Sequence, residues 1–80
     1  MIYVLMRKEI SKYLITKISC DYLFDKINNL NENDIRLDFL LVYYISNEFM
    51  RAYKTNKSIC KKDITEVNMP LNFKAFMYGN

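Results

Sequence analysis

Histidine and tryptophan are absent from this chain of 80 residues, which also has one glycine, one proline and two cysteines. The lack of histidine excludes the usual nucleophile–base triads and the common zinc sites. A single glycine is too few for a glycine-rich loop that binds phosphate. Intrinsic disorder is disfavoured, because 51% of the residues are hydrophobic and chain-breaking residues are scarce. We therefore expect an ordered, non-enzymatic protein without a cofactor or a metal site.

The sequence also lacks the run of about 18 apolar residues that a transmembrane helix needs. Residues 1–6 are apolar, but they are too few for a signal peptide and no basic segment precedes them. Cys20 and Cys60 alone do not make a disulfide framework. These observations predict a cytoplasmic protein that does not associate with membranes.

Aromatic side chains are abundant, with seven tyrosines and five phenylalanines. Eighty residues make one small domain, 1–80, which buries only about 60% of its unfolded surface. A chain of this size either packs its aromatic residues in the core or keeps some of them for a partner. We therefore expect a protein partner, either another protein or a second copy of the chain in a homodimer.

The excess of positive charge lies in the second half of the chain. Residues 1–40 contain six basic and six acidic side chains, whereas residues 41–80 contain six basic and three acidic ones. Four lysines fall within nine residues: Lys54, Lys57, Lys61 and Lys62. Such a cluster is typical of a solvated loop, and the alternative is a site that contacts the phosphates of a nucleic acid.

The residue pattern of the N-terminal region predicts two strands. The first strand is expected at residues 1–6, and a charged turn at residues 7–9. A second strand, paired with the first, is expected at residues 10–15. Neither glycine nor proline marks the turn, so a helix that begins at Lys8 is the competing interpretation.

Periodicity predicts three helices and two further strands after Thr16. Thr16 can cap a helix whose apolar stripe is Cys20, Leu23, Phe24, Ile27 and Leu30. Residues 35–39 alternate as a strand, residues 47–55 predict a second helix, and residues 55–62 predict a loop. Residues 64–69 predict the fourth strand, and Pro70 and Gly79 mark the limits of a last helix.

The predicted order is therefore β-β-α-β-α-β-α, an α/β (α+β) fold with one mixed four-stranded sheet and helices mainly on one face. The strand–helix–strand passage between Ile35 and Met69 predicts a right-handed crossover between parallel strands. Arg36, Asp38 and Glu66 suggest that the other face of the sheet is partly solvated. Asp38 is expected to accept hydrogen bonds from the backbone of the turn that follows it.

A candidate recognition site lies where the strand at 35–39 leads, through a loop, into the helix at 47–55. Ser46, Asn47 and Glu48 place short polar and acidic groups where a helix has unpaired backbone N–H donors. Ser46 suits the N-cap position and Glu48 the first turn. Small α/β domains often place recognition residues at such a corner.

One group of residues resembles the signature of STAS-like domains, which are small relatives of the anti-sigma-factor antagonists: Leu37-Asp38-Phe39, Val42, Tyr44-Ile45-Ser46 and Phe49. The resemblance extends from about Leu14 to Met77. Leu40 and Leu41 depart from it, because the family usually has small or polar residues in this turn.

The resemblance implies a regulatory module that binds a partner. In that family, antagonists dock on a kinase-like ATPase, and phosphorylation of a serine at the start of the second helix prevents docking. The resemblance places this phosphoacceptor at Glu48, whose carboxylate carries less than the charge of about −1.5 to −2 on a phosphoserine. It therefore implies a protein that is fixed in one state at Glu48, with Ser46 as the possible phosphoacceptor.

The sequence favours a regulatory module that binds another protein through residues 40–51. The candidate contact residues are Leu40, Leu41, Ser46, Asn47, Glu48 and Arg51. Two alternatives stay open. The first is a small nucleic-acid-binding protein that uses Lys54, Lys57, Lys61 and Lys62, and the second is an inhibitory subunit encoded by a mobile element.

Overall fold

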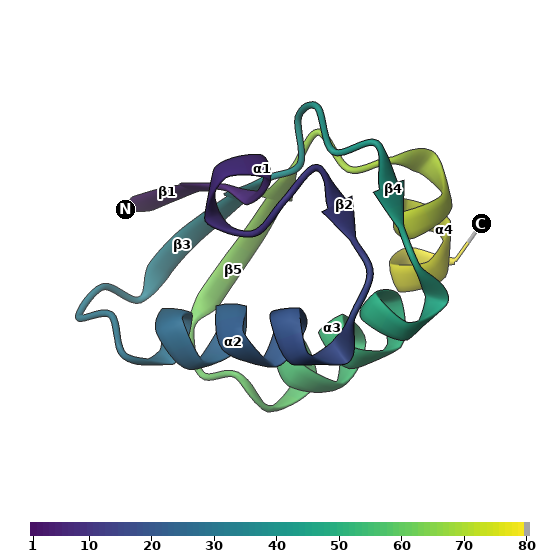
Figure 1. Ribbon diagram of the computed structural model, residues 1–80. Helices are drawn as coiled ribbons and strands as arrows, with labels where there is room; N and C mark the ends of the chain where they lie inside the picture. Colours follow the sequence, from purple (N-terminus) through teal and green to yellow (C-terminus); the bar gives the residue numbers. More distant parts are fainter. Residues whose placement is uncertain (80) are drawn as a thin grey trace.

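The computed structural model describes residues 1–79, and it is a small α/β fold, as the sequence predicts. Figure 1 shows its elements in chain order. They are β1 (Ile2–Leu5), α1 (Met6–Glu9), β2 (Tyr13–Leu14), α2 (Lys17–Asn28), β3 (Asp34–Asp38), β4 (Tyr44–Ile45), α3 (Asn47–Ile59), β5 (Asp63–Val67) and α4 (Leu71–Tyr78).

The strands form two parallel sheets, so the prediction of one mixed four-stranded sheet is wrong. The larger sheet has the order β1-β3-β5, and the smaller one consists of β2 and β4. A helix lies in the chain between the two strands of every pair, which returns the chain to the same end of the sheet and makes the strands parallel. The prediction that the strands near residues 35 and 64 are parallel is confirmed, and the structure shows that they are direct neighbours: β3 pairs with β5, and Ile35 lies opposite Ile64.

The N-terminal hairpin is also absent. β1 pairs with β3, and β2 pairs with β4, while the one-turn helix α1 occupies the predicted charged turn. The alternative of a longer helix from Lys8 is equally wrong, because α1 ends at Glu9. Met6 is fully buried and starts α1, so the chain turns away from the sheet as soon as β1 ends.

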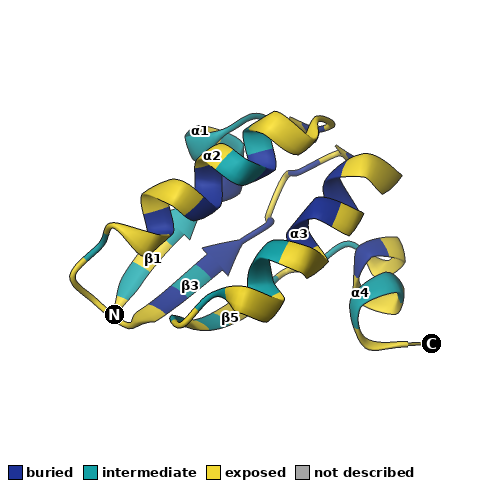
Figure 2. Ribbon diagram, turned by 90° about the horizontal axis from the view of Figure 1, so that it is seen from below, coloured by how far each residue is buried: buried dark blue, intermediate teal, exposed yellow. Residues whose placement is uncertain are grey.

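Helices α2 and α3 cover one face of the larger sheet (Figure 2). Four residues of the predicted stripe of α2 are buried: Cys20, Leu23, Phe24 and Ile27. Helix α3 continues to Ile59, so the loop predicted from residue 55 is wrong. Asn56 donates hydrogen bonds to the Ala52 carbonyl and to Asp21 of α2, both at 2.9 Å, and these contacts hold the last turns of α3 in helical form.

The centre of the core is aromatic. The Tyr53 ring lies 5.3 Å from Phe24, 5.0 Å from Phe73 and 6.2 Å from Phe39, in edge-to-face arrangements. Such pairs add about 0.5–1.5 kcal/mol each beyond the burial of their area. Since Phe73 is the fully buried residue of α4, these contacts attach the last helix to the rest of the fold.

Glu66 lies on the helix-covered face of the sheet, contrary to the predicted solvated face. It is the register partner of Leu37, and its side chain is only 5% exposed. Tyr53 and Lys57 of α3 both donate to its carboxylate at 2.6 Å, and Tyr78 of α4 donates at 2.5 Å. The hydrogen bonds from these three donors offset the free-energy cost of burying the Glu66 carboxylate.

The chain contains two successive β-α-β units of the same arrangement. We call β2-α2-β3 the first unit and β4-α3-β5 the second unit. Their first strands pair, their helices pack together, and their last strands pair. Because all of these pairs are parallel, α2 and α3 begin side by side at the same end of the molecule (Figure 1).

Candidate docking surface

The two helix starts are built in the same way. Thr16 caps α2 by accepting a hydrogen bond from the Ser19 backbone N–H at 3.1 Å, and Ser46 caps α3 by accepting from the Phe49 N–H at 3.0 Å. The hydroxyl of Ser46 also donates to the carbonyl of Ile15. Ser46 therefore joins the start of α3 to the segment that leads into α2, and the predicted N-cap role of Ser46 is confirmed.

Glu48 connects the same two helices. Its carboxylate accepts a hydrogen bond from the Lys17 backbone N–H at 2.8 Å, although Glu48 belongs to the first turn of α3 and Lys17 begins α2. A carboxylate near the N-terminus of a helix is stabilised by the helix dipole and by the unpaired N–H groups. The exposed side chain of Glu48 thus stabilises the first turn of both α2 and α3.

The outer side of the small β2–β4 sheet bears a tyrosine surface, which we define as Tyr13, Ile15, Tyr43 and Tyr44. Leu14 and Ile45 point into the core, so the alternate residues Tyr13 and Tyr44 point outward as register partners. The three tyrosines are 54%, 60% and 55% exposed in sequence order. The Tyr13 and Tyr43 rings meet edge to face at 6.1 Å, and the Lys12 ammonium lies 5.5 Å from the centre of the Tyr43 ring.

Residues 40–41, the leucine loop, are held in an exposed position at the end of β3. The Leu40 N–H donates to Asp38 at 2.9 Å, which confirms the predicted role of Asp38, and Arg7 donates to the Leu40 carbonyl at 3.4 Å. Leu41 has a φ of 63°, a left-handed conformation that costs a leucine about 1–2 kcal/mol. Such strain persists only where the surrounding contacts enforce it, and it is concentrated at functional positions.

Asp38 is the buried polar residue on which the leucine loop depends. The residue is 4% exposed, and its carboxylate also accepts hydrogen bonds from Asn68 at 3.0 Å and Tyr3 at 2.5 Å. Burial opposes the charge of Asp38, but these hydrogen bonds and the Leu40 N–H outweigh burial and hold the pKa of Asp38 below its usual value of 3.8. Asp38 is therefore an ionised acceptor that shapes the loop.

The structure divides the predicted contact residues between two ends of one segment. Leu40 and Leu41 lie in the leucine loop, and Figure 1 shows this loop and the start of α3 at opposite ends of β4. Asn47, Glu48 and Arg51 are exposed at the α3 end. There Glu48 and Arg51 line a groove of about 460 Å³ between α2 and α3, together with Lys17, Asp21, Ala52, Thr55 and Asn56.

Ser46, the candidate phosphoacceptor, is half-buried and its hydroxyl takes part in two hydrogen bonds. Addition of a phosphate would require the hydrogen bond that this hydroxyl donates to Ile15 to break. The structure thus shows a structural use for the Ser46 hydroxyl at this corner.

The four clustered lysines have different surroundings. Lys57 forms an ion pair with Glu66 at 2.6 Å, and Lys62 donates to the Leu30 carbonyl at 2.6 Å. Lys54 lies 5.3 Å from the centre of the Phe76 ring. Lys61 is exposed beside Asn28 and Asn33. Proximity in sequence therefore does not give four ammonium groups that are free to contact one ligand.

The residues of the tyrosine surface are not among those predicted from the sequence. The excess of tyrosine predicts a partner but does not identify which tyrosines are exposed. In the structure Val42 and Ile45 are buried, whereas Tyr43 and Tyr44 are exposed. The signal in the sequence is the alternation in Tyr13-Leu14 and Tyr44-Ile45, within two residues of the caps Thr16 and Ser46. This alternation is short, because each strand has only two residues.

Comparisons with protein-family models, with curated proteins and with solved structures give no match. None of the helices described in residues 1–79 has the length and apolar character required to cross a bilayer. Within the same residues, no three acidic or cysteine side chains are placed together as metal ligands would be.

Proposed function

We propose that this protein is a non-enzymatic regulatory module that binds another protein through the tyrosine surface and residues 40–51. The observation that supports this most is a group of three tyrosines, each more than half exposed: Tyr13 and Tyr44 on the paired strands β2 and β4, and Tyr43 directly before β4. Tyrosine is enriched in protein interfaces, because it offers a large apolar contact area and a polar hydroxyl at low entropic cost.

The arrangement around the tyrosines supports the same role. The leucine loop adds two exposed apolar side chains, and the contacts of Asp38 and Arg7 hold its backbone in one conformation. A preorganised loop loses little conformational entropy on binding. In contrast, the proposal of a nucleic-acid-binding protein has less support, because Lys57 and Lys62 already have partners within the fold.

The resemblance to STAS-like domains suggests a kinase-like ATPase as the partner. The position that carries the phosphorylated serine in that resemblance is Glu48 here, and its carboxylate joins the two helix starts. We propose that this corner is fixed in one state, because Glu48 has no hydroxyl that can be phosphorylated. An inhibitory subunit of a mobile element would use the same surface against a different partner.

The test of this function compares two double variants with a matched control. The partner is first captured from the native cell with the parent protein, and its dissociation constant is then measured by calorimetry. Loss of two exposed aromatic or apolar contacts should weaken binding by about 10- to 100-fold for Tyr43→Ser/Tyr44→Ser and for Leu40→Ser/Leu41→Ser. The control is Tyr22→Ser, because Tyr22 is equally exposed but lies on α2 outside the surface. Retention of parent-like affinity by both double variants would refute the proposal.

A further inference from the structure

The two edges of the larger sheet differ in their protection. β1 and β5 are both edge strands. β5 begins at the exposed Asp63 and directly follows Lys61 and Lys62, whereas β1 consists of Ile-Tyr-Val-Leu. Exposed edges are ordinarily protected by charged residues or proline, because unpaired backbone groups otherwise recruit another strand. β1 has neither form of protection.

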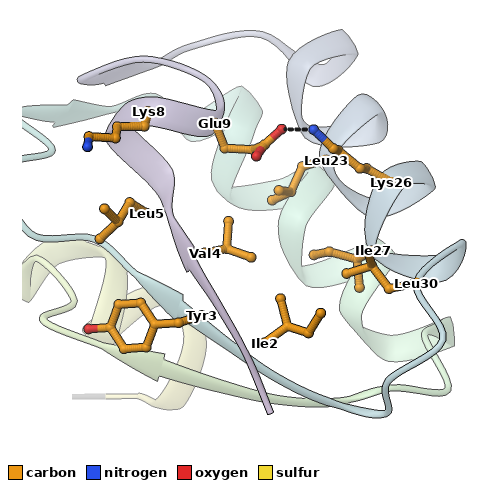
Figure 3. A pocket seen from close by; sticks show the side chains of 10 residues that line it. All are labelled: Ile2, Tyr3, Val4, Leu5, Lys8, Glu9, Leu23, Lys26, Ile27 and Leu30. Carbon is orange, nitrogen blue, oxygen red and sulfur yellow. Dashed lines mark hydrogen bonds and ion pairs between the residues drawn. The ribbon is translucent and has the colours of Figure 1, made fainter.

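An apolar groove of about 340 Å³ runs beside β1 and α2 (Figure 3). Figure 3 shows Ile2 and Val4 pointing toward α2, and Tyr3 and Leu5 pointing away from it. On the α2 side, the groove is lined by Leu23, Ile27 and Leu30. Alternate side chains of a strand added at this edge would therefore meet an apolar surface, while its backbone groups would meet those of β1.

The charged rim of the groove indicates the chemistry of the occupant. Glu9 is already paired with Lys26 at 2.5 Å, whereas Lys8 is exposed and forms no ion pair within the described residues. The free charge at the carboxyl end of β1 is therefore positive. Residues 1–8 contain no acidic side chain, so the β1 segment of a second copy offers Lys8 no partner.

We propose that β1 binds an extended segment of a partner protein, which adds a fourth strand to the sheet. The segment has apolar residues at alternate positions, which enter the groove, and an acidic residue that pairs with Lys8. Because β1 and the tyrosine surface are separate, this protein can contact two partner segments at once.

The probe is a seven-residue peptide, Glu-Val-Thr-Val-Thr-Val-Glu, with acetylated and amidated ends. The control peptide has lysine in place of both glutamates. At millimolar peptide, we expect backbone NMR shifts in residues 2–5 and 23–30, and tighter binding of the acidic peptide. Lys8→Glu should weaken binding of the acidic peptide about fivefold, as expected for an exposed ion pair, and should favour the lysine peptide. Thr65→Lys on β5 is the matched control and should leave binding unchanged.

Val4→Lys should abolish binding of the acidic peptide, and its folding is checked by the dispersion of its NMR spectrum. Lys8→Glu changes only an exposed side chain and keeps the proposal testable if Val4→Lys unfolds the protein. The absence of shifts along β1 would overturn the proposal, as would equal affinities for the two peptides. A dimer of the free protein that Val4→Lys dissociates would also overturn it, in favour of a second copy at this edge.

Discussion

The two β-α-β units have the same backbone arrangement but use their buried carboxylates differently. In the first unit, Asp38 ends β3 and accepts a hydrogen bond from the Leu40 N–H of the loop that follows it. In the second unit, Glu66 lies inside β5 and binds α3 and α4 through Lys57 and Tyr78. The first carboxylate shapes an exposed loop, and the second attaches the C-terminal helix. The same backbone arrangement therefore accommodates two uses of a buried carboxylate, one that shapes a loop and one that connects a strand to two helices.

The two units also differ in the residue that adopts a left-handed backbone conformation after β3 and after β5. Leu41 follows β3 with a φ of 63°, and Asn68 follows β5 with a φ of 56°. Asparagine tolerates this left-handed conformation much better than leucine does. The second unit thus has a residue suited to its backbone, and the first unit has a strained apolar residue that faces solvent.

The largest expected effect comes from removal of the carboxylate in the second unit. Glu66→Ala leaves the ammonium of Lys57 partly buried without its partner, and should lower the free energy of unfolding by about 3 kcal/mol. Denaturant unfolding followed by circular dichroism measures this loss. The matched control is Glu32→Ala, an exposed carboxylate, which should change stability by less than about 0.5 kcal/mol. Similar losses for both variants would mean that Glu66 does not attach α4.

Acid should weaken both units. Burial opposes the charge of Glu66, but the hydrogen bonds from Lys57, Tyr53 and Tyr78 prevail, so the pKa of Glu66, like that of Asp38, lies below its usual value. A carboxyl group with a lowered folded pKa stabilises the protein fully above its unfolded value, 4.5 for Glu66 and 3.8 for Asp38. This stabilisation is lost as the pH falls below those values toward the folded pKa.

Unfolding titrations at pH values from 7 to 2 measure the effect. Glu66→Gln should reduce the decline that begins near pH 4.5, and Asp38→Asn should reduce the part that begins near pH 3.8. A stability that is equal at pH 6 and pH 3 would contradict the assigned hydrogen bonds.

The smallest expected effect concerns the strained loop of the first unit. Leu41→Gly removes the unfavourable left-handed leucine but adds freedom to the unfolded chain, so the free energy of unfolding should change by less than about 1 kcal/mol. Asn68→Gly is the comparison variant: asparagine is little strained there, and its replacement also removes the hydrogen bond that Asn68 donates to Asp38, so this variant should lose stability. Thermal unfolding distinguishes the two variants. A large destabilisation by Leu41→Gly would show that this side chain packs within the fold.

The sequence predicts the elements that have a clear period or a local cap. The stripe of α2, the capping residues Thr16 and Ser46, and the strand at 35–39 all follow from neighbouring residues. The pairing of β1 with β3 does not, because parallel partners lie about 33 residues apart and leave no local turn signal.

Tertiary contacts also account for the other differences between the predicted and the observed structure. The end of α3 depends on hydrogen bonds from Asn56 and Lys57 to residues of α2 and β5, and these cannot be read from residues 55–62. Glu66 looks like an exposed strand residue until its three donors are known. The tyrosine surface depends on two strands of two residues each, which are too short to show a period.

The shared carboxylate of Glu48 has a consequence for communication between the two units. Any molecule that draws this side chain outward deprives the Lys17 amide, at the head of the neighbouring helix, of its acceptor. The first turn of α2 therefore depends for one of its hydrogen bonds on a side chain that belongs to α3.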